Sequence, residues 1–191
     1  MRLFAAIDLP ADVAESLAAV LPGDGRLRYV PSGQWHVTLA FYGEVTDSVV
    51  PELEARLARA ATRTPELRLH LEGGGCFPPG ARRARVLWCG VAGDVPALAR
   101  LAERAVAAGR RCGIDIGDRP FRPHITLARA RDHAVNLRSA VETLSSYESR
   151  EWTADQVHLV RSNLGPPTSH ERLRSWALCS APGRLPDGAG G

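Results

Sequence analysis

Two short segments of the chain carry residue types suited to acid–base chemistry on an anion. The sequence reads His-Val-Thr-Leu at 36–39 and His-Ile-Thr-Leu at 124–127. Side chains alternate along a strand, so we predict that His36 and Thr38 share one face, and that His124 and Thr126 do the same. Two imidazoles can supply one base and one acid at neutral pH, because the reference pKa of histidine is near ~6.5. The adjacent hydroxyls can hydrogen-bond to the oxygens of an anion.

The surroundings of these motifs give little support to a metal site. No carboxylate accompanies either motif, and the four cysteines form no Cys-x-x-Cys pair or other zinc-like spacing. We therefore expect reduced, mostly buried cysteines and no metal or other cofactor. The combination of paired imidazoles and hydroxyls favours in-line displacement at a phosphodiester without a metal ion.

Composition excludes several classes of protein and of chemistry. The chain has 191 residues, 45% hydrophobic and 24% charged, as expected for one compact domain or two small lobes that share a core. Its 24 basic residues are all arginine, which excludes Schiff-base lysines, P-loop lysines and lysine adenylates. The net charge of +3 is compatible with a polyanionic substrate. No apolar run approaches the roughly 18 residues of a membrane span, and no secretory signal is recognisable, so we expect a cytoplasmic protein.

The hydrophobic pattern predicts similar elements in the two halves of the chain. In the first half it predicts a strand at 2–9, a helix at 11–21, a strand at 35–42, a helix capped by Thr46 or Asp47, a strand at 66–71 and a glycine- and proline-rich loop at 73–80. In the second half it predicts a strand at 84–91, a helix at 94–109, a strand at 124–128, a helix at 135–144 and strands near 151–161 and 173–179. The last residues, 181–191, are predicted to form a flexible tail.

This agreement in order and motif predicts an internal duplication within one domain at 1–180. Each half contains a strand, a helix, a connection and then the strand with the His-x-Thr motif. The expected fold class is α+β with two pseudo-symmetric lobes. If a two-fold axis relates the lobes, the two His/Thr pairs face each other across one cleft.

The motifs and their flanks resemble a known family of enzymes. The two His-x-Thr-x motifs are similar to those of the two-histidine phosphoesterase superfamily. The flanking segments resemble its LigT-like branch of RNA 2′,3′-cyclic phosphodiesterases; they read RLFAAIDLP, HVTLAFYGEV, CFPPGARRARVLWCGV and RPFRPHITLAR. The resemblance runs from about residue 2 to residue 180.

The resemblance implies a bilobal fold with an antiparallel sheet and outer helices in each lobe and the active site in the groove between them. It implies metal-independent hydrolysis of RNA 2′,3′-cyclic phosphate ends to 2′-phosphomonoesters, and family members are also associated with reversible 2′–5′ joining of tRNA halves. It assigns His36 as proton donor and His124 as proton acceptor, with Thr38 and Thr126 holding the non-bridging phosphate oxygens. It also places Arg129 near the phosphate.

Four further residues are candidates for substrate binding. Arg129 has the strand parity of the buried Ile125, so it reaches the cleft only if the strand ends or bulges near Ala128. Phe41 and Phe77 are candidate surfaces for stacking a base. His170 stands where the family often has a tyrosine, which changes a candidate stacking ring. The remaining histidines, at 70, 133 and 158, carry no motif and are expected to be incidental.

Other functions are compatible with the same motifs. One alternative keeps the site but changes the substrate to a small cyclic nucleotide or an oligoadenylate. Another is a non-catalytic module that binds RNA ends, although arginine would serve binding alone better than two histidines. The leading prediction is a monomeric enzyme whose partner is RNA with cyclic phosphate ends, tRNA halves among them, and which does not bind membranes.

Overall fold

The computed structural model describes residues 1–165 and 168–180, so the predicted tail at 181–191 lies outside the described residues. The described residues form four α-helices, a short 3-10 helix and nine strands. The helices are α1 (Ala11–Val20), η1 (Ser32–Gln34), α2 (Val50–Ala61), α3 (Val95–Arg111) and α4 (Arg138–Ser145). The strands are β1 (Arg2–Asp8), β2 (Leu27–Tyr29), β3 (His36–Glu44), β4 (Leu67–Phe77), β5 (Val86–Gly93), β6 (His124–Ala130), β7 (Trp152–Ala154), β8 (Gln156–Asn163) and β9 (Ser169–Ala177).

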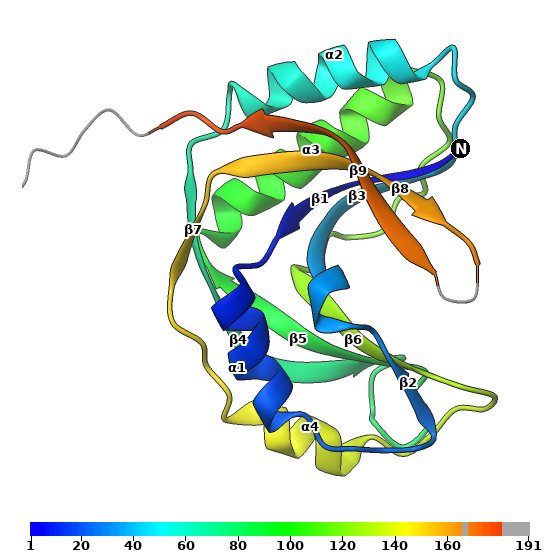
Figure 1. The fold of residues 1–191 in the computed structure, drawn as a ribbon, viewed down its shortest axis with the longest axis vertical. Coiled ribbons are helices and arrows are strands. Elements are labelled where there is room, and N and C mark those ends of the chain that lie inside the picture. Colours follow the sequence, from blue (N-terminus) through cyan, green and yellow to red (C-terminus); the bar gives the residue numbers. More distant parts are fainter. Residues whose placement is uncertain (166–167, 181–191) are drawn as a thin grey trace, which may run out of the picture.

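All nine strands belong to one sheet that curls into two halves (Figure 1). The order is β7-β4-β5-β6-β3-β1-β8-β9, with β2 paired to β6, and every pair of named strands is antiparallel. We call β3, β1, β8 and β9 the upper half-sheet, and β6, β5, β4, β7 and β2 the lower half-sheet. The two halves meet at β3 and β6 through a single pair, Val37 with Ile125. The α+β bilobal prediction is confirmed, with the sheets of the two lobes joined into one.

The helices cross from one half of the sheet to the other (Figure 1). Helix α1 follows β1 of the upper half-sheet but lies with α4 over the lower one. Helix α3 follows β5 of the lower half-sheet but packs on β3, and α2 lies beside it against β8 and β9. No helix among the described residues is long and apolar enough to cross a membrane. Equivalent elements thus occupy equivalent places about the β3–β6 junction, and on this basis we propose that the domain at 1–180 arose by duplication.

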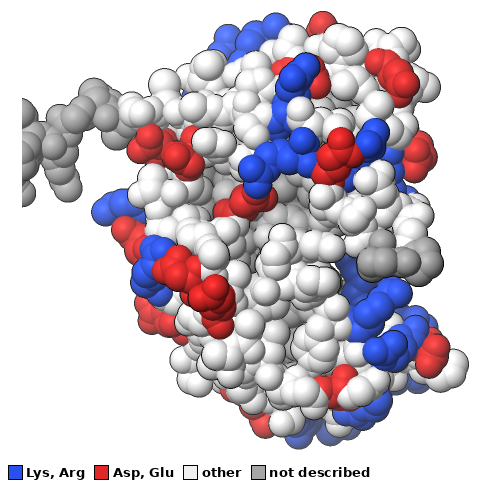
Figure 2. Space-filling view, in the orientation of Figure 1, with Lys and Arg blue, Asp and Glu red and all other residues white. Residues whose placement is uncertain are grey.

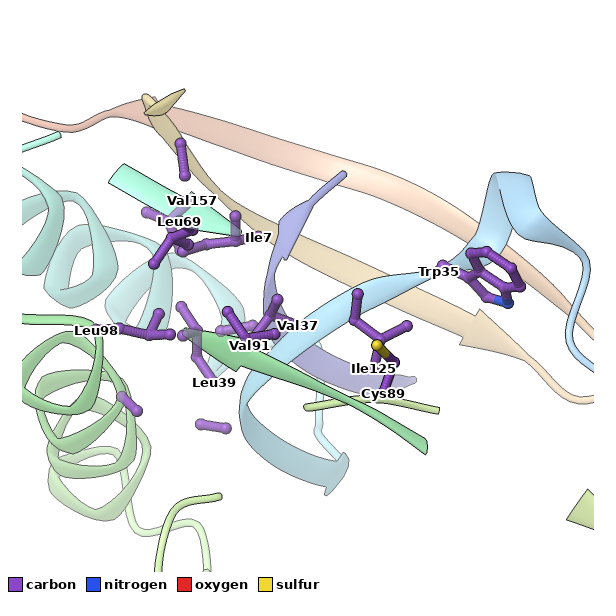
Figure 3. Close-up of a cluster of buried hydrophobic side chains, with 14 of the residues drawn as sticks. Ile7, Trp35, Val37, Leu39, Leu69, Cys89, Val91, Leu98, Ile125 and Val157 are labelled. Atoms are coloured by element: carbon purple, nitrogen blue, oxygen red, sulfur yellow. The ribbon is translucent and has the colours of Figure 1, made fainter. Parts of the chain in front are cut away.

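One buried cluster joins the two halves (Figure 3). Val37 and Leu39 of β3 point toward Leu98 of α3, and Val91 of β5 and Ile125 of β6 belong to the same cluster. Burying such a side chain contributes about 1.5–3 kcal/mol relative to leaving it exposed. The aliphatic residues of both motifs therefore anchor β3 and β6 and turn the polar residues of these strands toward the opposite face.

The prediction of a loop at 73–80 is wrong for the first part of this segment. Strand β4 continues to Phe77 and pairs with β5 along this length, with an irregularity at Gly73. The glycines serve packing rather than a loop: a Cβ on Gly75 would lie 2.2 Å from the Trp88 ring, and one on Gly74 would lie 2.4 Å from Cβ of Leu144. Glycine in a strand often marks such a close approach.

Smaller differences concern element ends. Helix α2 begins at Val50 and has no side-chain cap, so the predicted capping by Thr46 or Asp47 is wrong. Instead, the carbonyl of Thr46 accepts a hydrogen bond from the backbone N–H of Val49 in a turn. The sequence pattern does not predict strand β2 or the 3-10 helix, because elements of three residues show no periodicity.

Candidate active site

The four motif residues lie on one face at the junction of the two half-sheets. Because Val37 is the partner of Ile125 in an antiparallel pair, the register places His36 across from Thr126 and Thr38 across from His124. All four side chains are half-buried. The structure therefore brings the two distant motifs together, and each histidine lies across the strand pair from the threonine of the other motif.

The two imidazoles are held in the same way. His36 Nδ1 lies 2.8 Å from the carbonyl oxygen of Gln34, and His124 Nδ1 lies 2.6 Å from that of Arg122. A carbonyl oxygen can only accept, so Nδ1 carries the hydrogen in each ring. This leaves Nε2 of each histidine as the nitrogen available to take or give a proton.

Aromatic and histidine rings surround His36. Its ring stacks on Phe4 of β1 at 4.7 Å between centroids, and the edge of His170 from β9 lies 5.2 Å away. The pKa of His36 is lowered to about 4, mainly by burial; charge on His170 and His124 acts in the same direction, while the hydrogen bond to Gln34 and the charge of Asp8 oppose it. His36 is therefore neutral near pH 7 before an anion binds.

His124 lies against a different pair of rings. Phe77 at the end of β4 meets it edge-on at 5.3 Å, and Trp88 of β5 lies at 6.1 Å. Burial lowers the pKa of His124, the hydrogen bond to the Arg122 carbonyl raises it, and the charge of Arg129 lowers it. Phe77 therefore lies beside one of the two imidazoles and also lines the groove described below.

The threonine hydroxyls remain available to a ligand. Within residues 1–165 and 168–180, neither Thr38 nor Thr126 uses its hydroxyl in a hydrogen bond, and neither hydroxyl oxygen is buried without a partner. Both residues line the same groove. The two hydroxyls can thus donate to an anion bound between the imidazoles.

A β-bulge at the last residue of each motif changes the direction of the next side chains. The pairing of β3 with β1 skips Leu39, and the pairing of β6 with β5 skips Leu127. Strict alternation is therefore broken within each strand, and Phe41 and Arg129, at equivalent positions, reach the groove. The bulge that Arg129 requires occurs at Leu127, one residue earlier than expected.

His170 and a polar cluster around the buried His158 lie near His36. The ring of His170 also meets Phe4 edge-on at 5.1 Å, and burial lowers the pKa of His170. Asp8, the β-sheet partner of His36, pairs with Arg172 and lies 3.6 Å from Nε2 of His158. His158 is only 5% exposed, so it belongs to the support of the site although no motif marks it.

Sequence reasoning missed Phe4, Trp88, Asp8 and His158. Phe4 and Trp88 lie on predicted strands, but the sequence pattern does not indicate that these strands neighbour the motif strands. Asp8 and His158 become neighbours only when β8 pairs with β1, which the local pattern could not indicate.

The site opens into a groove of about 1710 Å³. The groove extends from Thr38, His124 and Thr126 to α3 and the segment 115–122. Among the described residues, no three His, Cys, Asp or Glu side chains gather closely enough to hold a metal ion. The arrangement can bind an anion between two hydroxyls and exchange protons with it through two imidazoles.

Comparison of the sequence with known proteins identifies one family, and the named relatives agree with it. Residues 10–166 match the family described as the 2′-5′ RNA ligase superfamily. The RNA 2′,3′-cyclic phosphodiesterase of Escherichia coli K12 is 34% identical over 181 residues, which covers 93% of this chain and 96% of that protein. The protein of the same name from Thermus thermophilus is 35% identical over 182 residues, covering 87% of this chain and 84% of that protein.

Solved structures resemble the whole described fold. A Thermus thermophilus crystal structure has a TM-score of 0.77 at 30% identity and covers 93% of this chain and 98% of that one. The apo form of Escherichia coli LigT has a TM-score of 0.74 at 30% identity, with coverage of 93% and 96%. LigT has also been crystallised with phosphate and with 3′-AMP.

Proposed function

The chain belongs to the 2′-5′ RNA ligase superfamily, and we propose that it hydrolyses RNA 2′,3′-cyclic phosphate ends to 2′-phosphomonoesters. The observation that carries this proposal is the pairing of two imidazoles, each with a free Nε2, with two free hydroxyls at the β3–β6 junction. The names of the relatives support the substrate, since they are RNA 2′,3′-cyclic phosphodiesterases. Crystals of LigT with phosphate and 3′-AMP support an anion and a nucleotide at such a site.

The proposed reaction is one in-line displacement at phosphorus. A water molecule attacks while Nε2 of His124 takes its proton, so a P–O bond to the former water forms. The P–O3′ bond breaks, and Nε2 of protonated His36 gives its proton to the leaving 3′ oxygen. The products are a 3′-hydroxyl and a 2′-phosphomonoester. Family resemblance supports this assignment of donor and acceptor; the symmetry of the two motifs does not decide it.

The other site residues act on the phosphate and on the imidazoles. Thr38 and Thr126 donate hydrogen bonds to the non-bridging oxygens, and Arg129 balances negative charge that develops on them. Phe77 contacts His124 and Phe41 offers a stacking surface. His170 contacts the His36 ring and the substrate beside it, in a place where a tyrosine would stack.

No metal or other cofactor is needed in this scheme. The imidazoles move the protons, and the hydroxyls and the guanidinium stabilise charge. We propose accordingly that the reaction proceeds in the presence of EDTA.

A second activity of the same site is 2′–5′ ligation. If the 5′-hydroxyl of a second RNA replaces water, the same displacement forms a 2′–5′ phosphodiester and releases the 3′-hydroxyl. The name of the matched superfamily favours this reaction. We propose that the products of this ligation include joined tRNA halves. We also propose that the enzyme acts as a monomer in the cytoplasm.

The test is turnover of a defined RNA end by the purified full chain. We expect an oligoribonucleotide with a terminal 2′,3′-cyclic phosphate to give a 2′-phosphate that phosphatase removes, with and without EDTA. His36→Ala and His124→Ala should each lower kcat about 10²–10⁴-fold. His133→Ala is the matched control, because that histidine is exposed.

Three results would contradict the proposal. Near-wild-type turnover in either motif variant would remove the assigned roles. Tight binding of the RNA end without product would favour the non-catalytic module, and turnover confined to small cyclic nucleotides or oligoadenylates would favour that alternative substrate. His36→Asn separates folding from chemistry, because an amide can donate to the Gln34 carbonyl but has no group at the place of Nε2.

A further inference from the structure

The proton donor of the proposed reaction lies in surroundings that oppose its protonation. The ring of His36 stacks on Phe4, and burial is the main reason that its pKa is lowered to about 4. The neighbouring rings of His170 and His124 lower this pKa further when they carry charge. A histidine that gives a proton near neutral pH therefore needs a neighbour that favours its imidazolium form.

Asp8 on β1 is placed to be this neighbour. It lies directly across from His36 in the antiparallel pairing of β1 with β3. The side chains of such a pair share one face of the sheet, with Cβ atoms about 4.5–5.5 Å apart. Phe4, which stacks on His36, is four residues before Asp8, so strand alternation puts both on this face. Among the described residues whose charge acts on the pKa of His36, Asp8 is the one that raises it.

A cation from β9 shares the carboxylate of Asp8. The guanidinium of Arg172 forms an ion pair with Asp8, and Nε2 of His158 on β8 lies 3.6 Å from the same carboxylate oxygen. Burial lowers the pKa of His158, so its ring is mostly neutral near pH 7. Arg172 is thus the positive charge that opposes Asp8. Figure 2 shows acidic and basic side chains next to one another over β8 and β9.

We propose that Asp8 is a positioning residue for the proton donor: its carboxylate favours the protonated ring of His36, and Arg172 limits how much of this negative charge acts on the ring. The pair of Asp8 with Arg172 has no net charge, so it repels a phosphate less than an unpaired carboxylate would. This inference rests on the proposed function, in which His36 gives its proton to the leaving 3′ oxygen.

The two members of the pair should change the pKa of His36 in opposite directions. Asp8→Asn removes the negative charge at nearly the same size, so the pKa of His36 should fall by about one unit, the low end of the effect of a close opposite charge. Arg172→Gln removes the positive charge and leaves Asp8, so the same pKa should rise. A side chain that only supported the fold would not produce opposite shifts.

NMR titration of the histidine Cε1–H resonances, with sulfate as the bound anion, measures these shifts. Sulfate stays a dianion throughout the titration and raises the pKa of a nearby imidazole. The spectrum of His36→Ala identifies the resonance of His36. Glu171→Gln is the matched control, because it removes a carboxylate that pairs with Arg161 on the other face of β9, and it should leave the pKa of His36 unchanged.

Turnover of a cyclic-phosphate oligoribonucleotide gives a second readout. Above its pKa, the protonated fraction of His36 falls tenfold for each unit by which this pKa is lowered. Asp8→Asn should therefore lower kcat/KM about tenfold near neutral pH, whereas Glu171→Gln should leave it unchanged.

Two results would overturn the proposal. One is an unchanged pKa of His36 in Asp8→Asn, and the other is a shift of the same sign in Asp8→Asn and Arg172→Gln. The titration does not depend on turnover, so a wild type that hydrolyses no cyclic phosphate would contradict the proposed function, while the titration would still decide whether Asp8 acts on His36.

Discussion

The pH dependence of kcat/KM follows from how deeply the two imidazoles are buried. With a pKa of about 4, His36 in the free enzyme is protonated in only about one molecule in 1,000 at pH 7, compared with roughly a quarter for an unperturbed histidine. Burial lowers the pKa of His124 as well. A reaction that needs one proton on the pair starts from the singly protonated free enzyme, whichever ring carries the proton. Because both pKa values lie below the ordinary ~6.5, this form is already being lost at pH 6.5, so kcat/KM should fall about tenfold per pH unit and about 100-fold between pH 6.5 and 8.5.

The assay is hydrolysis of a cyclic-phosphate oligoribonucleotide at low substrate concentration across this range. The alkaline limb of kcat should lie at higher pH than that of kcat/KM, because a bound phosphate anion favours the imidazolium and raises its pKa. EDTA should alter neither limb. A kcat/KM that is constant or rises from pH 6.5 to 8.5 would refute the reasoning, and a rate abolished by chelation would indicate a metal-bound hydroxide in place of the two histidines.

Three further predictions concern the site and its support. Thr38→Val and Thr126→Val keep the branched shape of the side chain but remove a hydrogen-bond donor to the charged phosphate. Losing such a bond costs about 1.5–3 kcal/mol, so kcat/KM should fall about 10- to 100-fold. Unchanged kinetics in both variants would exclude the hydroxyls from phosphate binding. Gly75→Ala would place a Cβ 2.2 Å from Trp88, so tryptophan fluorescence and kcat should both change, whereas Gly33→Ala, with nothing within 4 Å, should change neither. His36, His124 and His158 have folded-state pKa values below the unfolded value of ~6.5, so the stability that they contribute is present above that pH and is lost as the pH falls toward 4. Urea unfolding should therefore give a smaller free energy of unfolding at pH 4.5 than at pH 7, and equal values would contradict this.

Much of the site could be predicted because its residues lie in two short segments with the alternating pattern of a strand. Strand alternation was sufficient to place His36 beside Thr38, since the aliphatic residues between and after them must be buried. The same reasoning failed beyond Leu39 and Leu127, because a bulge depends on the neighbouring strand and leaves no mark in a seven-residue pattern. Position 41 or 129 could therefore be assigned to the groove only from the pairing itself.

The glycine-rich segment shows a different limit of sequence reasoning. Glycine indicates a turn when the chain needs unusual backbone angles, but at Gly74 and Gly75 it gives room for side chains from other elements. Leu144 and Trp88 are distant in sequence, so their need for space is not visible locally. The contact between Asp8 and the buried His158 is equally non-local, because it forms when β8 joins β1, and Arg172 of β9 then pairs with Asp8.

The crossing of α1 and α3 between the half-sheets means that neither half of the chain can bury its own surface. A break in the connection at 78–85, between β4 and β5, would give two fragments, each with one His-x-Thr motif and strands of both half-sheets. Each fragment would hold a helix whose sheet lies mostly in the other fragment. The fragments would then fold only by associating with each other. Because each fragment contributes one of the two imidazoles, cleavage of a cyclic phosphate would measure how much of the two-fragment complex has formed.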